Sequence, residues 1–320
     1  FYITFNNPEA AIPLLQATLD CYPYSINHWN SLGKCYLSTN DYEEAHEAID
    51  FALAIDDSNA EALTLKAFCY QQSGELQKSC DYYLRLAEQQ ENKTRAYLAL
   101  AKTYFEMQDY TSSIYYIEAL LDNKDALSKY ELSELYGDIA LCHAALKHIG
   151  VGQASIRRSL ELNENDPDTL IVAGRFFLME AKACNDETAK AENQAKGELY
   201  FRQALNLIME DERLDYLFTI GAACFDTQNF KLAAQYYEQI NREFPDNAPA
   251  TYFFLAYCYF YLEEAISCMH YIAKMKHELP DAYSNLGTSD SILSDTRFNE
   301  LMRNLKDSVN NGKVDLDNFL

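Results

Sequence analysis

Residues that interrupt helices are scarce in this sequence, which has only seven prolines and ten glycines in 320 residues. With an apolar fraction of 48%, this scarcity favours a folded, all-helical chain and argues against a disordered or collagen-like one. No stretch of 18 apolar residues occurs, so the sequence predicts no transmembrane helix. The apolar run Tyr252–Leu262 is too short to span a bilayer and is typical of a buried helix.

Positive charge is also scarce. The chain has 26 Lys and Arg against 49 Asp and Glu, a formal net charge of -23. A nucleic-acid ligand needs cations that neutralise its phosphates, and an anionic membrane surface needs them as well. The composition therefore excludes both as expected ligands. It leaves two interpretations, a solvated acidic surface or a basic partner.

Paired cysteine motifs are absent, although the chain has nine cysteines. No Cys-x-x-Cys occurs, and Cys35, Cys69, Cys142 and Cys258 share one slot in a repeated pattern where a small apolar residue fits. An odd count of cysteines, at least four of which packing explains, predicts a reducing compartment, and hence cytoplasmic localisation. The chain begins at Phe1 with an incomplete first hairpin, so we expect a fragment or a processed form.

What the sequence does contain is a repeat of about 34 residues. In its first complete copy, Trp29, Leu32, Gly33, Tyr36 and Ala45 hold fixed positions, and later copies keep the same spacing. One slot is always small, because two helices cross there: Gly33, Ala67, Ala101, Ala140, Gly174, Gly221 and Ala256. Such a period predicts stacked helical hairpins, each burying its apolar face on its neighbours.

These residues resemble the tetratricopeptide repeat over nearly the whole chain. The resemblance implies an all-α superhelix, a solenoid of about seven hairpins. We expect a partial hairpin at 1–25, repeat units at about 26–59, 60–93, 94–127, 133–166, 167–212, 214–247 and 249–282, and a capping helix and tail at 283–320. An insertion near 183–192 is expected to lengthen both helices of its hairpin, with the turn at Asn185-Asp186. Pro13 is expected to kink or delay the helix over 8–23.

The resemblance also implies that the first helix of each hairpin lines a concave groove. Its candidate binding residues are Asn30, Lys34, Arg95, Lys102, Arg175, Phe218, Phe225, Phe253, Tyr257 and Phe260. The polar half carries several cations, and the carboxyl-terminal half is aromatic. We expect an apolar partner segment in the aromatic half. The alternative is that the last helix or the tail at 314–320 already covers these rings. Replacing Phe253 and Phe260 with Ser is expected to weaken binding while the helices stay intact.

No catalytic, metal or cofactor motif stands out. Cys142-His143 with His148, and Cys268 with His270 and His277, lack the spacing of a four-ligand metal site. The sequence therefore predicts a non-catalytic scaffold or adaptor that binds another protein or peptide, without nucleic acid, membrane insertion, metal or cofactor. The alternative function is the sensor or regulatory region of a larger protein. Self-association through the incomplete first hairpin is a further alternative.

Overall fold

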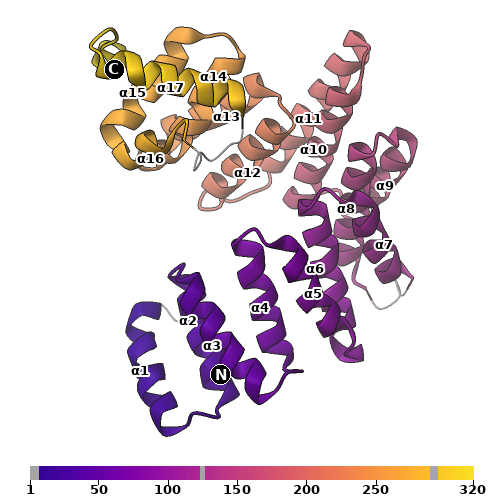
Figure 1. The fold of residues 1–320 in the computed structure, drawn as a ribbon. Coiled ribbons are helices and arrows are strands. Elements are labelled where there is room, and N and C mark those ends of the chain that lie inside the picture. The colour runs from indigo at the N-terminus through magenta and orange to yellow at the C-terminus, as the bar shows by residue number, and fades with distance from the viewer. Residues whose placement is uncertain (1–6, 123–126, 289–294) are drawn as a thin grey trace. The chain divides into compact units, whose positions relative to one another are not determined.

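The computed structural model describes residues 7–122, 127–288 and 295–320, and Figure 1 shows that these residues form helices joined by short connections. The chain divides into two compact units, Phe1–His148 and Ile149–Leu320. The boundary falls inside the hairpin expected at 133–166. No helix among the described residues combines the length and apolarity that crossing a bilayer requires.

The amino-terminal unit contains eight α-helices in its described part. They are α1 (Pro8–Cys21), α2 (Ile26–Ser38), α3 (Tyr42–Ile55), α4 (Ala60–Gln72), α5 (Leu76–Ala87), α6 (Lys93–Glu106), α7 (Tyr110–Leu121) and α8 (Lys129–Ala145), with a 3-10 turn η1 (Gln90–Asn92) before α6. Helices α2 and α3, α4 and α5, and α6 and α7 pack as hairpins, and each hairpin packs on the next. We call α2, α4 and α6 the first helices of this unit, and α1, α3, α5 and α7 its second helices.

The carboxyl-terminal unit continues the pattern in its described residues. It contains α9 (Ile149–Leu162), α10 (Pro167–Ala183), α11 (Glu187–Leu205), α12 (Arg213–Asp226), α13 (Phe230–Glu243), α14 (Tyr252–Tyr261), α15 (Ala265–Glu278), α16 (Pro280–Asn285) and α17 (Thr296–Asn310), with 3-10 turns η3 (Pro245–Thr251) and η4 (Leu316–Phe319). The hairpins are α10–α11, α12–α13 and α14–α15, with α10, α12 and α14 as first helices. The predicted all-α fold of stacked hairpins is confirmed within each unit.

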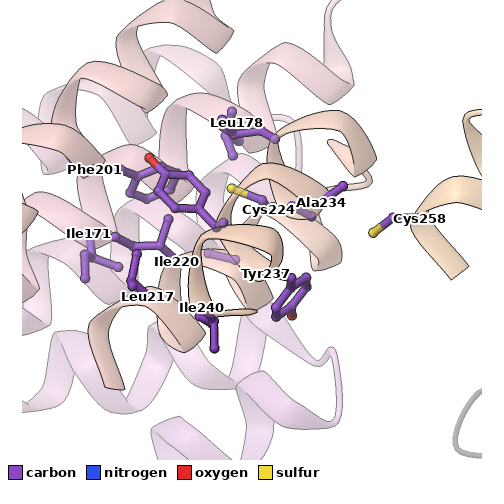
Figure 2. Packing of buried hydrophobic residues seen from close by; sticks show 14 of the residues in the cluster. Ile171, Leu178, Phe201, Leu217, Ile220, Cys224, Ala234, Tyr237, Ile240 and Cys258 are labelled. Atoms are coloured by element: carbon purple, nitrogen blue, oxygen red, sulfur yellow. The ribbon is translucent and has the colours of Figure 1, made fainter. Parts of the chain in front are cut away.

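Helix crossings explain the small-residue slot. A Cβ on Gly174 would lie 2.4 Å from the Phe201 ring, and one on Gly221 would lie 2.9 Å from the ring of Tyr237. Ala67 and Ala256, in the same slot, are fully buried. Figure 2 shows Phe201 and Tyr237 in the core of the carboxyl-terminal unit. The predicted role of these residues, close approach of two helices, is therefore confirmed.

Six of the turns between helices share one hydrogen-bond pattern. After α2, the N–H of Asp41 donates to the carbonyl of Tyr36, and Asn40 has a positive φ of 63°. This Schellman-type ending recurs after α4, α6, α8, α12 and α14. The positive-φ residue is Gly only at Gly74, and the others are Asn40, Gln108, Lys147, Gln228 and Glu263.

Three local expectations can be compared with the helices. The turn in the inserted hairpin lies between Ala183 and Glu187, where the sequence predicts it. Helix α1 begins at Pro8, so the predicted delay by Pro13 is wrong. Asn7 caps α1 by accepting the N–H of Ala10 at 3.0 Å, and the bond that Pro13 cannot donate would have gone to the exposed first turn. Residues 129–132, which fall between the units expected at 94–127 and 133–166, belong to α8, which Ser128 caps.

Candidate functional site

The first-helix face of the amino-terminal unit is polar and open. Lys34 of α2 forms an ion pair with Glu61 of α4, and the amide of Asn30 donates to Glu61 Oε2 at 3.0 Å. Burial alone would raise the pKa of Glu61, but the hydrogen bonds from Lys34 and Asn30, with the charges of Lys34 and Arg95, outweigh it and lower that pKa. Glu61 on α4 therefore interacts with cations on the two neighbouring first helices, Lys34 on α2 and Arg95 on α6.

The predicted residues of this face differ in exposure. Asn30 is buried and also donates to Asn59 Oδ1 at 3.1 Å, so its amide ties α2 to the start of α4. Arg95 and Lys102 on α6 are exposed. Between the α2 and α6 cations, Phe68 of α4 has 42% of its surface exposed. The face thus presents an exposed ring with cations on either side.

The first-helix face of the carboxyl-terminal unit is aromatic. Phe225 of α12 lies 5.3 Å from Phe254 and 5.1 Å from Tyr257, measured between ring centroids. Phe218 and Phe225 are half-buried, whereas Phe253 and Tyr257 of α14 are buried. Arg175 of α10 pairs with Asp226 at 3.6 Å. The rings predicted to line this face are therefore near one another on α12 and α14.

Helix α17 covers the α14 part of these rings. Phe298 lies 6.1 Å from Phe253, 5.1 Å from Tyr257 and 5.4 Å from Phe260 between ring centroids. Phe298 is 1% exposed, and Met302 and Leu305 of α17 belong to the same buried cluster. The alternative expectation, in which the chain's own last helix covers the rings, therefore describes the structure.

Polar contacts also hold α17 in place. Asp295 caps the helix by accepting from the N–H of Phe298 at 3.0 Å, and the same carboxylate accepts the hydroxyls of Tyr257, at 2.6 Å, and of Tyr261. Arg297 lies over the rings of Phe260 and Tyr261. Partial burial alone would raise the pKa of Asp295, but these hydrogen bonds lower it to about 2.

The tail lies on a different helix. Leu316 is fully buried, and His270 Nδ1 of α15 is 2.6 Å from the carbonyl oxygen of Phe319. The tail therefore packs on the second helix of the last hairpin, while α17 covers the first.

This arrangement changes the expected effect of the serine substitutions. Phe253 is 5% exposed within the core, so Phe253→Ser would cost stability as well as altering a surface. The expectation that it leaves the helices intact is not supported by this burial. Sequence reasoning missed Asp295 as a contact, although an acidic residue at the start of the amphipathic pattern over 295–309 was a visible signal of a cap.

No three His, Cys, Asp or Glu side chains lie together as a metal site within residues 7–122, 127–288 and 295–320. His143 and His148 have ring centroids 5.7 Å apart, and burial is the first cause that lowers the pKa of His143.

Comparison with known proteins points to one family. Residues 30–94 match a family model described as tetratricopeptide repeat. Similar solved structures include PilF of Pseudomonas aeruginosa, at 18% identity over 69% of this chain and 92% of that chain, with a TM-score of 0.46. They also include PilW, a widely conserved type IV pilus biogenesis factor (17% identity, 69% and 94% coverage, TM-score 0.48). A third is YrrB, a TPR protein with an unusual peptide-binding site, at 16% identity over 64% of this chain and 96% of that chain, with a TM-score of 0.42. No curated protein matches the chain. The family match, together with the recurring hairpins and their small-residue crossings, identifies this chain as one that contains tetratricopeptide repeats.

Proposed function

We propose that the chain is a non-catalytic scaffold that binds a segment of another protein on the first-helix face of its amino-terminal unit. The observation that carries this proposal is Phe68, an exposed aromatic ring at the centre of that face with Lys34 on one neighbouring helix and Arg95 on the other. Exposed aromatic residues are favoured anchors of protein interfaces, and the cations beside this one select for a partner with acidic groups.

The charges on this face support an acidic or hydrogen-bonding partner segment. Lys34 is already paired with Glu61, whereas Arg95 and Lys102 lie on α6 seven residues apart, two turns along one side of the helix. A partner carboxylate near Arg95 would replace solvent rather than an existing salt bridge. Arg95 and Lys102 would therefore contribute more to binding than Lys34.

The aromatic face of the carboxyl-terminal unit enters the proposal in a second role. Its rings Phe253, Tyr257 and Phe260 hold α17, an amphipathic helix with Phe298 as its anchor. An external segment could bind these three rings only where it displaces α17. The half-buried rings of Phe218 and Phe225, on α12, are not among the three rings that Phe298 covers, and they extend the aromatic surface.

The cysteines support a proposal for the compartment in which the scaffold works. None of the nine cysteines is paired, and seven of them are buried as packing residues, so we place the scaffold in a reducing compartment, the cytoplasm. An effector segment joined to this region in a longer protein would instead favour the regulatory alternative.

Binding can be tested with one double variant and a matched control. Phe68→Ser with Arg95→Ala removes the proposed anchor and its cation, while Tyr115→Ser removes a ring that is 63% exposed on the second helix α7. Proteins captured from native lysate should be lost with the double variant and retained with Tyr115→Ser. A photo-crosslinking residue at position 68 should label the same captured protein. Equal capture by the double variant and the control would reject the proposed face.

A further inference from the structure

A recess lies between the second helices α1 and α3, on the side of α2 opposite the face proposed above. It has a volume of ≈ 500 Å³, within the range of about 300–1,000 Å³ that is usual for ligand pockets. Its lining residues are Gln16, Leu19, Asp20, Pro23, Trp29, Leu32, Tyr36, Glu44, Glu47, Ala48 and Phe51. Trp29, Leu32 and Tyr36 lie on the opposite face of α2 from Asn30 and Lys34, because each residue advances about 100° around a helix. This recess, the α1–α3 cleft, is therefore separate from the face proposed above.

The cleft exists because one ring of the repeat is missing. In three other hairpins, a tyrosine of the first helix stacks on a tyrosine of the second. The stacked pairs are Tyr70–Tyr82 and Tyr104–Tyr116, both with centroids 5.6 Å apart, and Tyr259–Tyr271 at 5.9 Å. Tyr82, Tyr116 and Tyr271 are each the seventh residue of their helix. In α3 the seventh residue is Ala48, so among the described residues no second-helix tyrosine stacks on Tyr36, and the recess lies at this position.

The floor and ends of the cleft are ordered and largely apolar. Leu19, Leu32 and Ala48 are buried and form the floor. At one end Trp29 stacks on Phe51, with centroids 4.5 Å apart, and Phe51 is 55% exposed. Side-chain hydrogen bonds fix the walls, from Gln16 Nε2 to the Tyr36 hydroxyl at 2.9 Å and from Trp29 Nε1 to the Pro23 carbonyl at 2.7 Å. A large apolar side chain can enter this recess without rearranging the backbone.

The rim of the cleft is acidic. Asp20, Glu44 and Glu47 are exposed, and none of them has an ion pair with a cation of the described chain. Lys34 is the only Lys or Arg before Lys66, whereas the first 65 residues contain ten Asp and Glu. These carboxylates create a negative potential that attracts a cation and repels an anionic surface.

From this geometry we propose that the α1–α3 cleft binds a cationic segment of a partner protein, which inserts one large apolar side chain onto Leu32 and Ala48 and places Lys or Arg beside Asp20, Glu44 and Glu47. The charge also argues against a second copy of this chain as the occupant, since the chain has a net charge of -23. The cleft and the first-helix face would then hold different partners, or different parts of one partner.

The single tryptophan gives a local readout, because Trp29 lines the cleft. The probe is a synthetic amphipathic Lys/Leu peptide added to the full chain. It should shift Trp29 emission at saturation, and its affinity should fall as salt is raised. A Glu/Leu peptide and a Lys/Ala peptide of equal length should bind at least about 10-fold more weakly, since each lacks one of the two recognised features.

Two variants separate the cleft from general attraction to an acidic protein. Ala48→Tyr supplies the ring found at this position in α5, α7 and α15 and keeps the charge, and it should weaken Lys/Leu binding by about 10-fold or more. Glu44→Gln with Glu47→Gln, at exposed positions, should weaken it by about 10-fold at low salt. The charge-matched control Glu210→Gln with Asp211→Asn, in the carboxyl-terminal unit, should leave it unchanged.

The proposal is overturned if the Glu44/Glu47 pair and the Glu210/Asp211 pair weaken binding equally, or if folded Ala48→Tyr binds as the wild type does. It is also overturned if Trp29 emission shifts with protein concentration alone and sedimentation shows a dimer, because the occupant is then a second copy. Loss of the binding face at Phe68 would leave these results unaffected, so the two proposals fail independently.

Discussion

The hydroxyl of Tyr257 on α14 donates a 2.6 Å hydrogen bond to the carboxylate of Asp295, the residue that caps α17. This bond joins a side chain on the first-helix face to the start of the helix that covers it. Tyr261 donates to the same carboxylate, and Phe298 lies over the Tyr257 ring. The contact combines a charged acceptor with aromatic packing, so removing one hydroxyl isolates its polar part.

Tyr257→Phe is expected to loosen α17 while leaving the ring contacts in place. A hydrogen bond to a charged group contributes about 1.5–3 kcal/mol, and the bond from Tyr261 remains, so we expect a loss of about 1–2 kcal/mol. Hydrogen exchange should accelerate at the amides of α17 and not in α2 or α4. Uniform acceleration across the chain would show that the hydroxyl stabilises the whole fold rather than this helix.

Acid should release α17 through Asp295. Its pKa is about 2 in the folded chain against an ordinary value of 3.8, so the folded state favours the charged carboxylate. A depressed pKa contributes stability that is present above the unfolded value and is lost as pH falls through the folded one. Protection of α17 amides should therefore decline between about pH 4 and pH 2. Asp295→Asn should start with lower protection and show a flatter profile in this window, and parallel profiles would contradict the assignment.

Two glycines offer a matched test of helix crossing. Gly174→Ala would place a Cβ 2.4 Å from the buried Phe201 ring, and overpacking of this kind costs about 1–3 kcal/mol. Gly150 in α9 has nothing within 4 Å of the position that an added Cβ would take, so Gly150→Ala should stabilise by about 0.5–1 kcal/mol. Chemical denaturation of both variants measures the difference. Equal effects would mean that helix propensity, not crossing distance, selects Gly174.

Two substitutions in the hairpin turns are expected to change stability in opposite directions. Gln228 has a φ of 62°, a conformation that costs a residue with a Cβ about 1–2 kcal/mol. Gln228→Gly should therefore stabilise by about 0.5–1 kcal/mol after the added freedom of the unfolded chain is subtracted. Gly74, with a φ of 77° and open space around it, should lose a similar amount on substitution by Gln. Denaturation midpoints that move in the same direction for both variants would reject this account.

Much of the fold could be predicted because the repeat encodes it locally. The recurrence of Gly33, Ala67 and Ala101 fixes where helices cross, and the polar turn residues fix where hairpins reverse. The amphipathic pattern at 295–309 likewise predicts α17, whose buried residues are Phe298, Met302 and Leu305. Each of these features depends on neighbours at short, regular separations.

The candidate sites were harder to predict, because they depend on contacts between different elements. Periodicity identifies the face on which Phe253 and Phe260 lie, but it does not determine whether α17 returns to cover them. The pairing of Asp295 with Tyr257 spans 38 residues and follows from that return. The α1–α3 cleft did have a sequence signal, since Ala48 stands where Tyr82 and Tyr116 stand in the next two copies. Comparing the copies for a missing ring would have found it.

The unequal exposure of the thiols has a practical consequence for study of this protein. Cys21 at the end of α1 is exposed and Cys184 is partly so, whereas the other seven are buried, and burial raises the pKa of the Cys69, Cys80 and Cys142 thiols to about 11. A maleimide dye should therefore attach first at Cys21, next to Asp20 on the cleft rim, in the native chain. The remaining thiols would react only as their hairpins open, so the number of dyes bound over time would report which repeats unfold first.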